Sequence, residues 1–213
     1  MPAVEVLPGL RGLVLVGGGS VRMGRDKAAL RLGGESLLCR TARLAGRFCE
    51  EVWVSGRDPA SVDPAAASLV AGWLPDPVRG VGPLAGLVAG LRALGGPLLI
   101  LPCDLPLMDA PILARLVAAR RHDIGDCLVT QFLQSYTGYV EALVSIYEAG
   151  ALPYMERALE SGDFRLRLIL PEASRRLVSY DKSESAAFLN CNRPEDLAML
   201  AGLGSVLEPP DEE

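Results

Sequence analysis

Residues 13–34 read LVLVGGGSVRMGRDKAALRLGG and join a short apolar run to a glycine-rich turn. The run LVLV predicts a buried strand. Glycine permits positive φ and carries no side chain, so the backbone N–H groups of the turn can approach an anion closely. Arg22 and Lys27 add two positive charges to this turn. The stretch therefore predicts a strand that leads into a loop that binds a phosphate chain.

Two similar apolar runs, VWV at 52–54 and LLIL at 98–101, also predict strands buried on both faces. Amphipathic stretches of helical length lie between the runs, at 36–48 and 83–94. This alternation predicts an α/β fold with a parallel sheet and right-handed crossovers. The second half of the chain predicts further elements of both kinds: helices at 111–121, 152–162 and 193–204, and strands at 127–132 and 139–147.

Composition limits the classes of protein to consider. The chain has 213 residues, of which 50% are apolar, enough for the core of one domain. The net charge of −5 argues against a nucleic-acid partner, which requires a basic surface. No apolar run approaches the ~18 residues that cross a bilayer, so we expect no membrane partner. We expect a single domain over 1–206 and an acidic, disordered tail at 207–213.

The cysteines and the histidine argue against a zinc site and a disulfide framework. The five cysteines include no C-x-x-C pair, and His122 is the single histidine of the sequence. Free thiols are typical of a reducing compartment, so we expect the protein in the cytoplasm.

Two familiar phosphate-binding motifs do not fit the opening loop. A P-loop requires Lys and then Ser or Thr after its last glycine, but Arg25 and Asp26 follow Gly24. A dinucleotide-binding fingerprint requires glycine where Arg22 stands. A solvated turn that leads into a helix is the structural alternative.

The stretch LVGGGSVRMGRDKAAL, residues 15–30, resembles the L-A-G-G-x-S-x-R-M-G-x-D-K-x-L-L signature of nucleotidyltransferases, and most closely that of molybdenum cofactor guanylyltransferases. The resemblance implies a three-layer, Rossmann-like nucleotidyltransferase fold, with a mostly parallel central sheet and helices on both faces. It also implies that the loop wraps a nucleoside triphosphate, with Arg22 and Lys27 as catalytic cations. The nucleotide contacts implied in this stretch are Leu15, Val16, Gly17, Gly18, Gly19 and Lys27.

The segment WLPDPVRGVGPLAGL, residues 73–87, resembles the part of these enzymes that recognises guanine. The resemblance implies nucleotide contacts from Asp76, Gly82, Pro83 and Leu84. A carboxylate can accept paired hydrogen bonds from guanine N1–H and the exocyclic amine, although Asp76 could equally bind the ribose. The structural alternative is an ordinary helix start with Pro83 in its first turn.

The segment PLLILPCDLPLMD, residues 97–109, ends a buried strand at Cys103 and Asp104. Ligands in parallel sheets bind beyond the carboxyl ends of strands, and Mg²⁺ takes one or two carboxylates together with phosphate oxygens and water. The resemblance implies that Asp104 binds the metal and the nucleotide and takes part in catalysis. A helix cap is the structural alternative for Asp104.

The segment AAFLNCNRPEDLAML, residues 186–200, resembles the family's F-x-N-x-N-T-P-E-D-L motif. There the two asparagines hold the acceptor, which implies acceptor contacts from Asn190 and Asn192. An amide donates and accepts hydrogen bonds without charge, which suits a pterin edge or a phosphate. For the residues from Pro194 to Asp196 we favour a structural role as a helix start. The N-terminal half of the domain is thus expected to bind the nucleotide and the C-terminal half the acceptor.

Four positions depart from the family pattern. Val16 replaces an alanine, Ser55 stands where asparagine is frequent, Ala142 replaces a proline, and Arg193 replaces the threonine of N-T-P-E-D. The departures touch the acceptor side more than the triphosphate side, so the acceptor is less firmly indicated than the nucleotide.

The activity that the resemblance implies is transfer of GMP from GTP to the phosphate of molybdopterin or of the molybdenum cofactor, with Mg²⁺. Molybdopterin guanine dinucleotide and pyrophosphate are the products. No general base is needed because the acceptor phosphate is already ionised, and His122 is expected at the surface. The implied protein partners are a molybdopterin-inserting enzyme and the recipient oxidoreductases.

Three other functions stay open at this point. A cytidylyltransferase would use CTP on the same cofactor, but such enzymes tend to have L-A-A-G and lack the G-P-L-A-G found here at 82–86. Sugar-1-phosphate nucleotidyltransferases share the first loop but are usually longer chains. A nucleotide-binding chaperone that delivers the cofactor without catalysis is expected to lack Arg22, Lys27 or Asp104, and all three are present.

Overall fold

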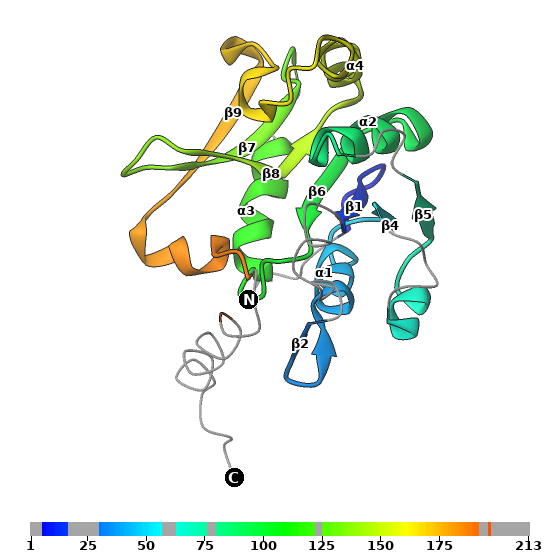
Figure 1. The fold of residues 1–213 in the computed structure, drawn as a ribbon. Helices are drawn as coiled ribbons and strands as arrows, with labels where there is room; N and C mark the ends of the chain where they lie inside the picture. The colour runs from blue at the N-terminus through cyan, green and yellow to red at the C-terminus, as the bar shows by residue number, and fades with distance from the viewer. Residues whose placement is uncertain are drawn as a thin grey trace.

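The computed structural model describes residues 6–16, 30–56, 63–75, 80–121, 125–191 and 196. Within these residues a seven-stranded sheet forms the centre of the molecule, in the order β5-β4-β1-β6-β8-β7-β9 (Figure 1). The strands are β1 (Arg11–Leu15), β4 (Glu51–Ser55), β5 (Gly72–Leu74), β6 (Leu98–Pro102), β7 (Val129–Gln134), β8 (Val140–Tyr147) and β9 (Arg175–Tyr180).

The sheet is mostly parallel, as the sequence predicts. β5, β4, β1 and β6 run parallel to one another, and β9 runs parallel to β7. β8 lies antiparallel to both of its neighbours, β6 and β7. In the register of the central strands, Leu15 lies opposite Ser55 on one side and Pro102 on the other, so these three strands end at one level.

Helices cover both faces of the sheet, which confirms the three-layer architecture. α1 (Leu37–Ala45) and α3 (Ala110–Arg121) pack on one face, and α2 (Pro83–Leu94) and α4 (Leu152–Ser161) on the other. Alternate strand residues supply the two cores: Val14 and Leu99 face α1 and α3, whereas Leu13 and Leu98 face α2 and α4. Strands buried on both faces have continuous apolar sequences for this reason.

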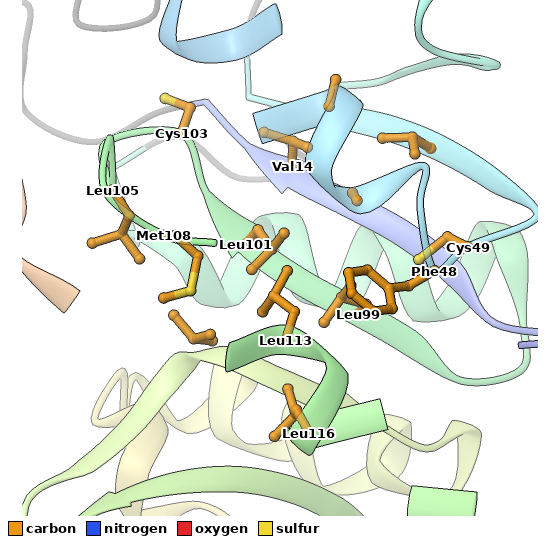
Figure 2. Close-up of a cluster of buried hydrophobic side chains, with 14 of the residues drawn as sticks. Val14, Phe48, Cys49, Leu99, Leu101, Cys103, Leu105, Met108, Leu113 and Leu116 are labelled. Atoms are coloured by element: carbon orange, nitrogen blue, oxygen red, sulfur yellow. The ribbon is translucent and has the colours of Figure 1, made fainter. Parts of the chain in front are cut away.

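Figure 2 shows the core on the side of α1 and α3. Leu99 and Leu101 of β6 point toward Leu113 of α3, and Phe48 meets them from the segment after α1. Leu105 and Met108, which follow β6, lie in the same core and are 6% and 4% exposed. The chain beyond the carboxyl end of β6 is therefore anchored.

The predicted helices at 36–48, 83–94, 111–121 and 152–162 agree with α1 to α4 to within a few residues. α4 ends, as predicted, at Gly162, which adopts a left-handed conformation. Short 3-10 helices connect the larger elements: η4 (Pro64–Ser68), η5 (Ala149–Ala151), η6 (Leu166–Leu168), η7 (Glu172–Ser174) and η8 (Lys182–Phe188).

Three strand features were not predicted from the sequence. They are the hairpin of β2 (Arg31–Leu32) and β3 (Glu35–Ser36), the three-residue β5, and β9. The predicted helix at 193–204 lies outside the described residues apart from Asp196, and the tail at 207–213 lies wholly outside them. The domain bounds of 1–206 stay a prediction. In the part of the chain that the structure describes, no helix is both long and apolar enough to cross a membrane.

The approach of α2 to β1 depends on Gly90. A Cβ atom at this position would lie 2.5 Å from Leu13 Cδ2 and 2.9 Å from Leu98 Cδ1, and both leucines are fully buried. The small residue thus lets the helix pack directly on the central strands.

Gly90→Ala tests this packing. Alanine favours a helix over glycine by about 1 kcal/mol, but overpacking a core costs about 1–3 kcal/mol. We expect the free energy of unfolding to fall by about 1 kcal/mol in urea denaturation. An increase, the usual result for a glycine on an exposed helix face, would contradict the close approach.

Candidate active site

The carboxyl ends of the central strands form one continuous edge. The Val16 N–H donates to the Ser55 carbonyl (2.8 Å), and the Cys103 N–H donates to the Leu15 carbonyl (3.2 Å). Hydrogen bonding between neighbours thus continues one residue beyond β1 and β6. Open parallel sheets bind their ligands at this edge.

Half of the predicted site residues lie outside the described residues. These are Gly17, Gly18, Gly19, Arg22, Lys27, Asp76 and Asn192. Arg193 and His122, to which no role at the site was given, also lie outside them. The described chain stops after Val16 and after Pro75, each next to a strand end at this edge. Their roles in binding and catalysis stay predictions.

The side chains of three predicted nucleotide contacts belong to the core. Leu15, Val16 and Leu84 are 9%, 2% and 0% exposed. Leu15 and Leu84 lie in the core between the sheet and α2, and the Val16 N–H is already bonded to Ser55. Any contact of these residues with a nucleotide must therefore come from the backbone.

Gly82 and Pro83 form the start of α2, where both are exposed. Gly82 has φ 72° and ψ −156°, a conformation essentially restricted to glycine, and no side chain caps the helix. α2 follows β5 and precedes the parallel β6, so its amino end lies at the carboxyl edge of the sheet. The first N–H groups of a helix lack partners within it and favour an anion.

Asp104 follows β6 at this edge and is half-buried. Its neighbours Cys103 and Leu105 are each 6% exposed and packed in the core. Two contacts hold the segment in place: the Asp104 carbonyl accepts the Cys191 N–H (2.7 Å), and Arg40 Nε donates to the Pro106 carbonyl (2.8 Å). The backbone at Asp104 is thus fixed from two sides.

The structure assigns the cap of α3 to another aspartate. The Asp109 carboxylate accepts the Ile112 N–H (3.0 Å), the usual contact of an N-cap side chain. The helix-cap interpretation of Asp104 is therefore wrong for α3.

Asn190 lies beside Asp104 although the two residues are far apart in the sequence. The Cys191 N–H that binds the Asp104 carbonyl belongs to the next residue along the chain. Cys191 is fully buried, packed with Leu37, whereas Asn190 is exposed. The structure thus brings together one predicted metal-binding residue and one predicted acceptor-binding residue.

The donor set at this edge fits a metal carried by a nucleotide. Among the described residues no group of three or more His, Cys, Asp or Glu side chains could hold a metal ion by itself. Mg²⁺ usually binds through one or two carboxylates, with phosphate oxygens and water as the other ligands. Asp104 supplies one carboxylate of the required kind.

Two of the departures from the family pattern are structural in this fold. Ser55 is 2% exposed, and its carbonyl accepts the Val16 N–H within the sheet. Ala142 is 8% exposed in the core beside α4, and its carbonyl accepts the Tyr147 hydroxyl (2.9 Å). Neither side chain offers a polar group toward the solvent.

A polar network on the C-terminal side of the edge was not anticipated. The Tyr180 hydroxyl donates to Glu141 Oε1 (2.6 Å) and accepts from Gln134 Nε2 (3.1 Å). Burial raises the pKa of Glu141 above its usual value, while the Tyr180 hydrogen bond and the Arg167 charge act against this rise. Burial and the neighbouring carboxylate raise the pKa of Tyr180, which keeps its hydroxyl protonated as a donor. The sequence pointed to this network only through Tyr180, which ends β9, a strand that was not predicted.

Comparison with known proteins shows what this chain is similar to. Residues 12–179 match the family model of the MobA-like NTP transferase domain. A probable molybdenum cofactor guanylyltransferase of Synechococcus elongatus is 34% identical over 194 residues, which cover 86% of this chain and 94% of that protein. The molybdenum cofactor guanylyltransferase of Burkholderia vietnamiensis is 32% identical over 94% of this chain and 99% of its own.

A similar solved structure is that of molybdopterin-guanine dinucleotide biosynthesis protein A from Archaeoglobus fulgidus. It superimposes with a TM-score of 0.71 at 25% identity and covers 92% of this chain and 99% of that one.

Proposed function

The chain belongs to the MobA-like NTP transferase family and is a nucleotidyltransferase, and we propose that it transfers GMP from GTP to the terminal phosphate of molybdopterin or of the molybdenum cofactor. The relatives named molybdenum cofactor guanylyltransferase carry this proposal, and the structural observation that supports it is the hydrogen bond between the Cys191 N–H and the Asp104 carbonyl. It joins the strand edge expected to bind the nucleotide to the segment expected to bind the acceptor.

The reaction is a substitution at phosphorus. An oxygen of the acceptor phosphate forms a bond to the α-phosphorus of GTP, the bond from that phosphorus to the bridging oxygen of the β-phosphate breaks, and pyrophosphate leaves with the electron pair. The attacking phosphate is ionised at neutral pH, so no side chain must remove a proton. The work left to the protein is positioning and charge neutralisation.

The residues of this chain divide these tasks. Asp104 is the residue that would hold Mg²⁺, which when bound supplies positive charge to the phosphate oxygens. Arg22 and Lys27 are proposed to offset the charge that builds up on the α-phosphate and pyrophosphate. Asn190 and Asn192 are proposed to orient the acceptor through uncharged hydrogen bonds.

Recognition of guanine is proposed for Asp76 and the turn that starts α2. The exposed Gly82 and Pro83 leave backbone atoms accessible at the start of the helix, which supports a base or phosphate contact there. The names of the relatives favour GTP over CTP for the same site. We further propose that the enzyme works in the cytoplasm, in transient contact with a molybdopterin-inserting enzyme and recipient oxidoreductases.

The nucleotide can be identified directly. The purified chain is incubated with Mg²⁺, molybdopterin or its molybdenum form, and GTP, CTP or ATP in separate reactions. We expect pyrophosphate release with GTP, and GMP on hydrolysis of the isolated cofactor. Turnover with CTP alone would overturn the guanylyl assignment, and nucleotide binding without any turnover would favour a delivery chaperone.

Removal of Asp104 or Lys27 tests the proposed catalytic groups. We expect Asp104→Ala and Lys27→Ala each to lower turnover by about 10²-fold or more, the usual effect of removing a preorganised charge. The matched control is Asp109→Ala, the same change five positions along the chain at the α3 cap. It is expected to cost about 1 kcal/mol of stability and to leave turnover nearly unchanged. Full activity of Asp104→Ala would refute its role.

Two glycines at opposite ends of α2 provide a test of the nucleotide site. Gly82 (φ 72°, ψ −156°) and Gly95 (φ 60°, ψ −172°) share a conformation that strains any other residue, and a Cβ on either meets no atom within 4 Å. Each change to alanine should cost about 1–3 kcal/mol of stability. Only Gly82→Ala should also weaken GTP binding in calorimetry, and equal GTP affinities of the two variants would argue against a nucleotide contact at Gly82.

A further inference from the structure

The segment that carries Asn190 begins with a tightly held 3-10 helix, η8. The Asp181 carboxylate accepts the Ser183 N–H (2.8 Å), and the Asp181 N–H donates to Glu184 Oε2 (3.3 Å). From α3, Arg115 forms an ion pair with Glu184 and donates to the Ser179 carbonyl. η8 is therefore fixed to both β9 and α3.

η8 ends at Phe188, whose ring lies in an aromatic cluster with Tyr180 and Phe132. The rings of Phe188 and Tyr180 are stacked, with centroids 4.0 Å apart and planes 18° apart. Phe132 meets Phe188 edge-on at 5.2 Å and 73°, and meets Tyr180 edge-on at 6.1 Å and 85°. The two edge-on contacts have a favourable geometry for aromatic pairs and hold the Phe188 ring in the cluster.

The Tyr180 ring is itself fixed at its hydroxyl end. Its hydrogen bonds to Glu141 and Gln134 come from β8 and β7. The stacked Phe188 therefore rests on a surface whose position is set by three neighbouring strands.

Only two residues separate Phe188 from the next anchor. Leu189 and Asn190 are exposed, and Cys191 is fully buried with its N–H on the Asp104 carbonyl. Three residue steps span at most about 11 Å, so two fixed ends leave the exposed Asn190 little room to move. The ring stack at one end and the hydrogen bond at the other thus determine where Asn190 lies relative to Asp104.

We propose that the stacked pair of Phe188 and Tyr180 is a positioning device for the acceptor site. Neither ring is required to touch substrate; the pair holds Asn190 at the right place beside Asp104. The inference rests on the proposed function for its kinetic consequence, because Asn190 is the proposed acceptor contact. A misplacement of about 1 Å in such a site can lower turnover by about 10²-fold.

The variant Phe188→Leu removes the ring and keeps an apolar side chain. We expect the KM for the molybdopterin acceptor to rise about tenfold or more, with GTP affinity within about twofold of the unmodified chain. Phe188→Tyr, which keeps the ring, should restore the acceptor KM to within about twofold of its original value.

The matched control is Phe48→Leu. Phe48 is 2% exposed in the same core but lies at the amino-terminal side of β1 and β4, where its carbonyl accepts the Leu7 N–H and the Glu50 N–H donates to the Leu10 carbonyl. We expect this variant to lower the thermal midpoint at least as much as Phe188→Leu, without a change in the acceptor KM. A purely structural role of Phe188 predicts that the two variants behave alike.

Hydrogen exchange gives a second readout that needs no activity. The Cys191 amide, which donates to the Asp104 carbonyl, should exchange about tenfold or more faster in Phe188→Leu than in Phe48→Leu. Tyr180→Phe keeps the stack and loses the hydroxyl, so we expect a smaller change in the same direction. This variant decides the question if Phe188→Leu does not fold.

The outcomes separate the two proposals. An unmodified chain that transfers no nucleotide overturns the proposed function, while the exchange of the Cys191 amide still tests the positioning. An active chain in which Phe188→Leu leaves both the acceptor KM and the Cys191 exchange as they are in Phe48→Leu overturns the positioning inference. A tenfold loss of GTP affinity in Phe188→Leu overturns it as well.

Discussion

The pairing of β1 with β4 on one side and β6 on the other is the constraint on which the rest of the structure depends. A strand buried on both faces must satisfy every backbone group through its neighbours, and β1 does so in a register that brings three strand ends to one level. Each segment that leaves this edge starts beside the others. The backbone hydrogen bonds of the sheet therefore determine where the proposed site lies, whatever its side chains are.

The C-terminal part of the chain reaches the same edge by a different route. β8 reverses direction, so β7 and β9 again run parallel to β6 and end on the same side as Asp104. β9 ends on this side at Tyr180, and η8 follows it. The Cys191 N–H then donates to the Asp104 carbonyl, which connects this segment to the end of β6. Because of the antiparallel strand β8, the C-terminal strands β7 and β9 end at the same edge of the sheet as the N-terminal strands.

The sequence predicts the central strands and the four helices well because their apolar patterns report burial directly. β9 was missed because it is an edge strand whose arginines have structural partners: Arg175 binds the Leu170 carbonyl, and Arg176 binds the Ala119 carbonyl. β5 was missed because it has three residues, one of them Gly72, which lies under the Trp53 ring. Short and half-exposed strands take their identity from neighbours that no local pattern reveals.

The same distinction applies to the site. Local motifs predicted roles for Asp104 and Asn190, and these roles stay predictions. The bond that joins their segments and the ring cluster beside it are set by tertiary packing, and the cluster combines residues from β7, β9 and η8. Motif matching also gave Leu15 and Leu84 as nucleotide contacts without showing that their side chains fill the core. Residues that border a site commonly serve the core with the side chain and the ligand with the backbone, and sequence alone does not separate these two uses.

Charge explains why the proposed site must be built locally. The chain carries a net charge of −5, so long-range attraction does not favour a triphosphate or a phosphorylated acceptor. Short-range donors must supply the affinity. α2 precedes β6, which ends at the site edge, so its amino end, which no side chain caps, lies on that side with its positive partial charge. Helix ends act only over the first turn, which makes affinity for phosphate depend on the exact placement of the loops between strand and helix. An acidic protein can bind a polyanion on these terms only if its fold holds those loops firmly, and at Asp104 the buried neighbours and the bond from Cys191 meet that requirement.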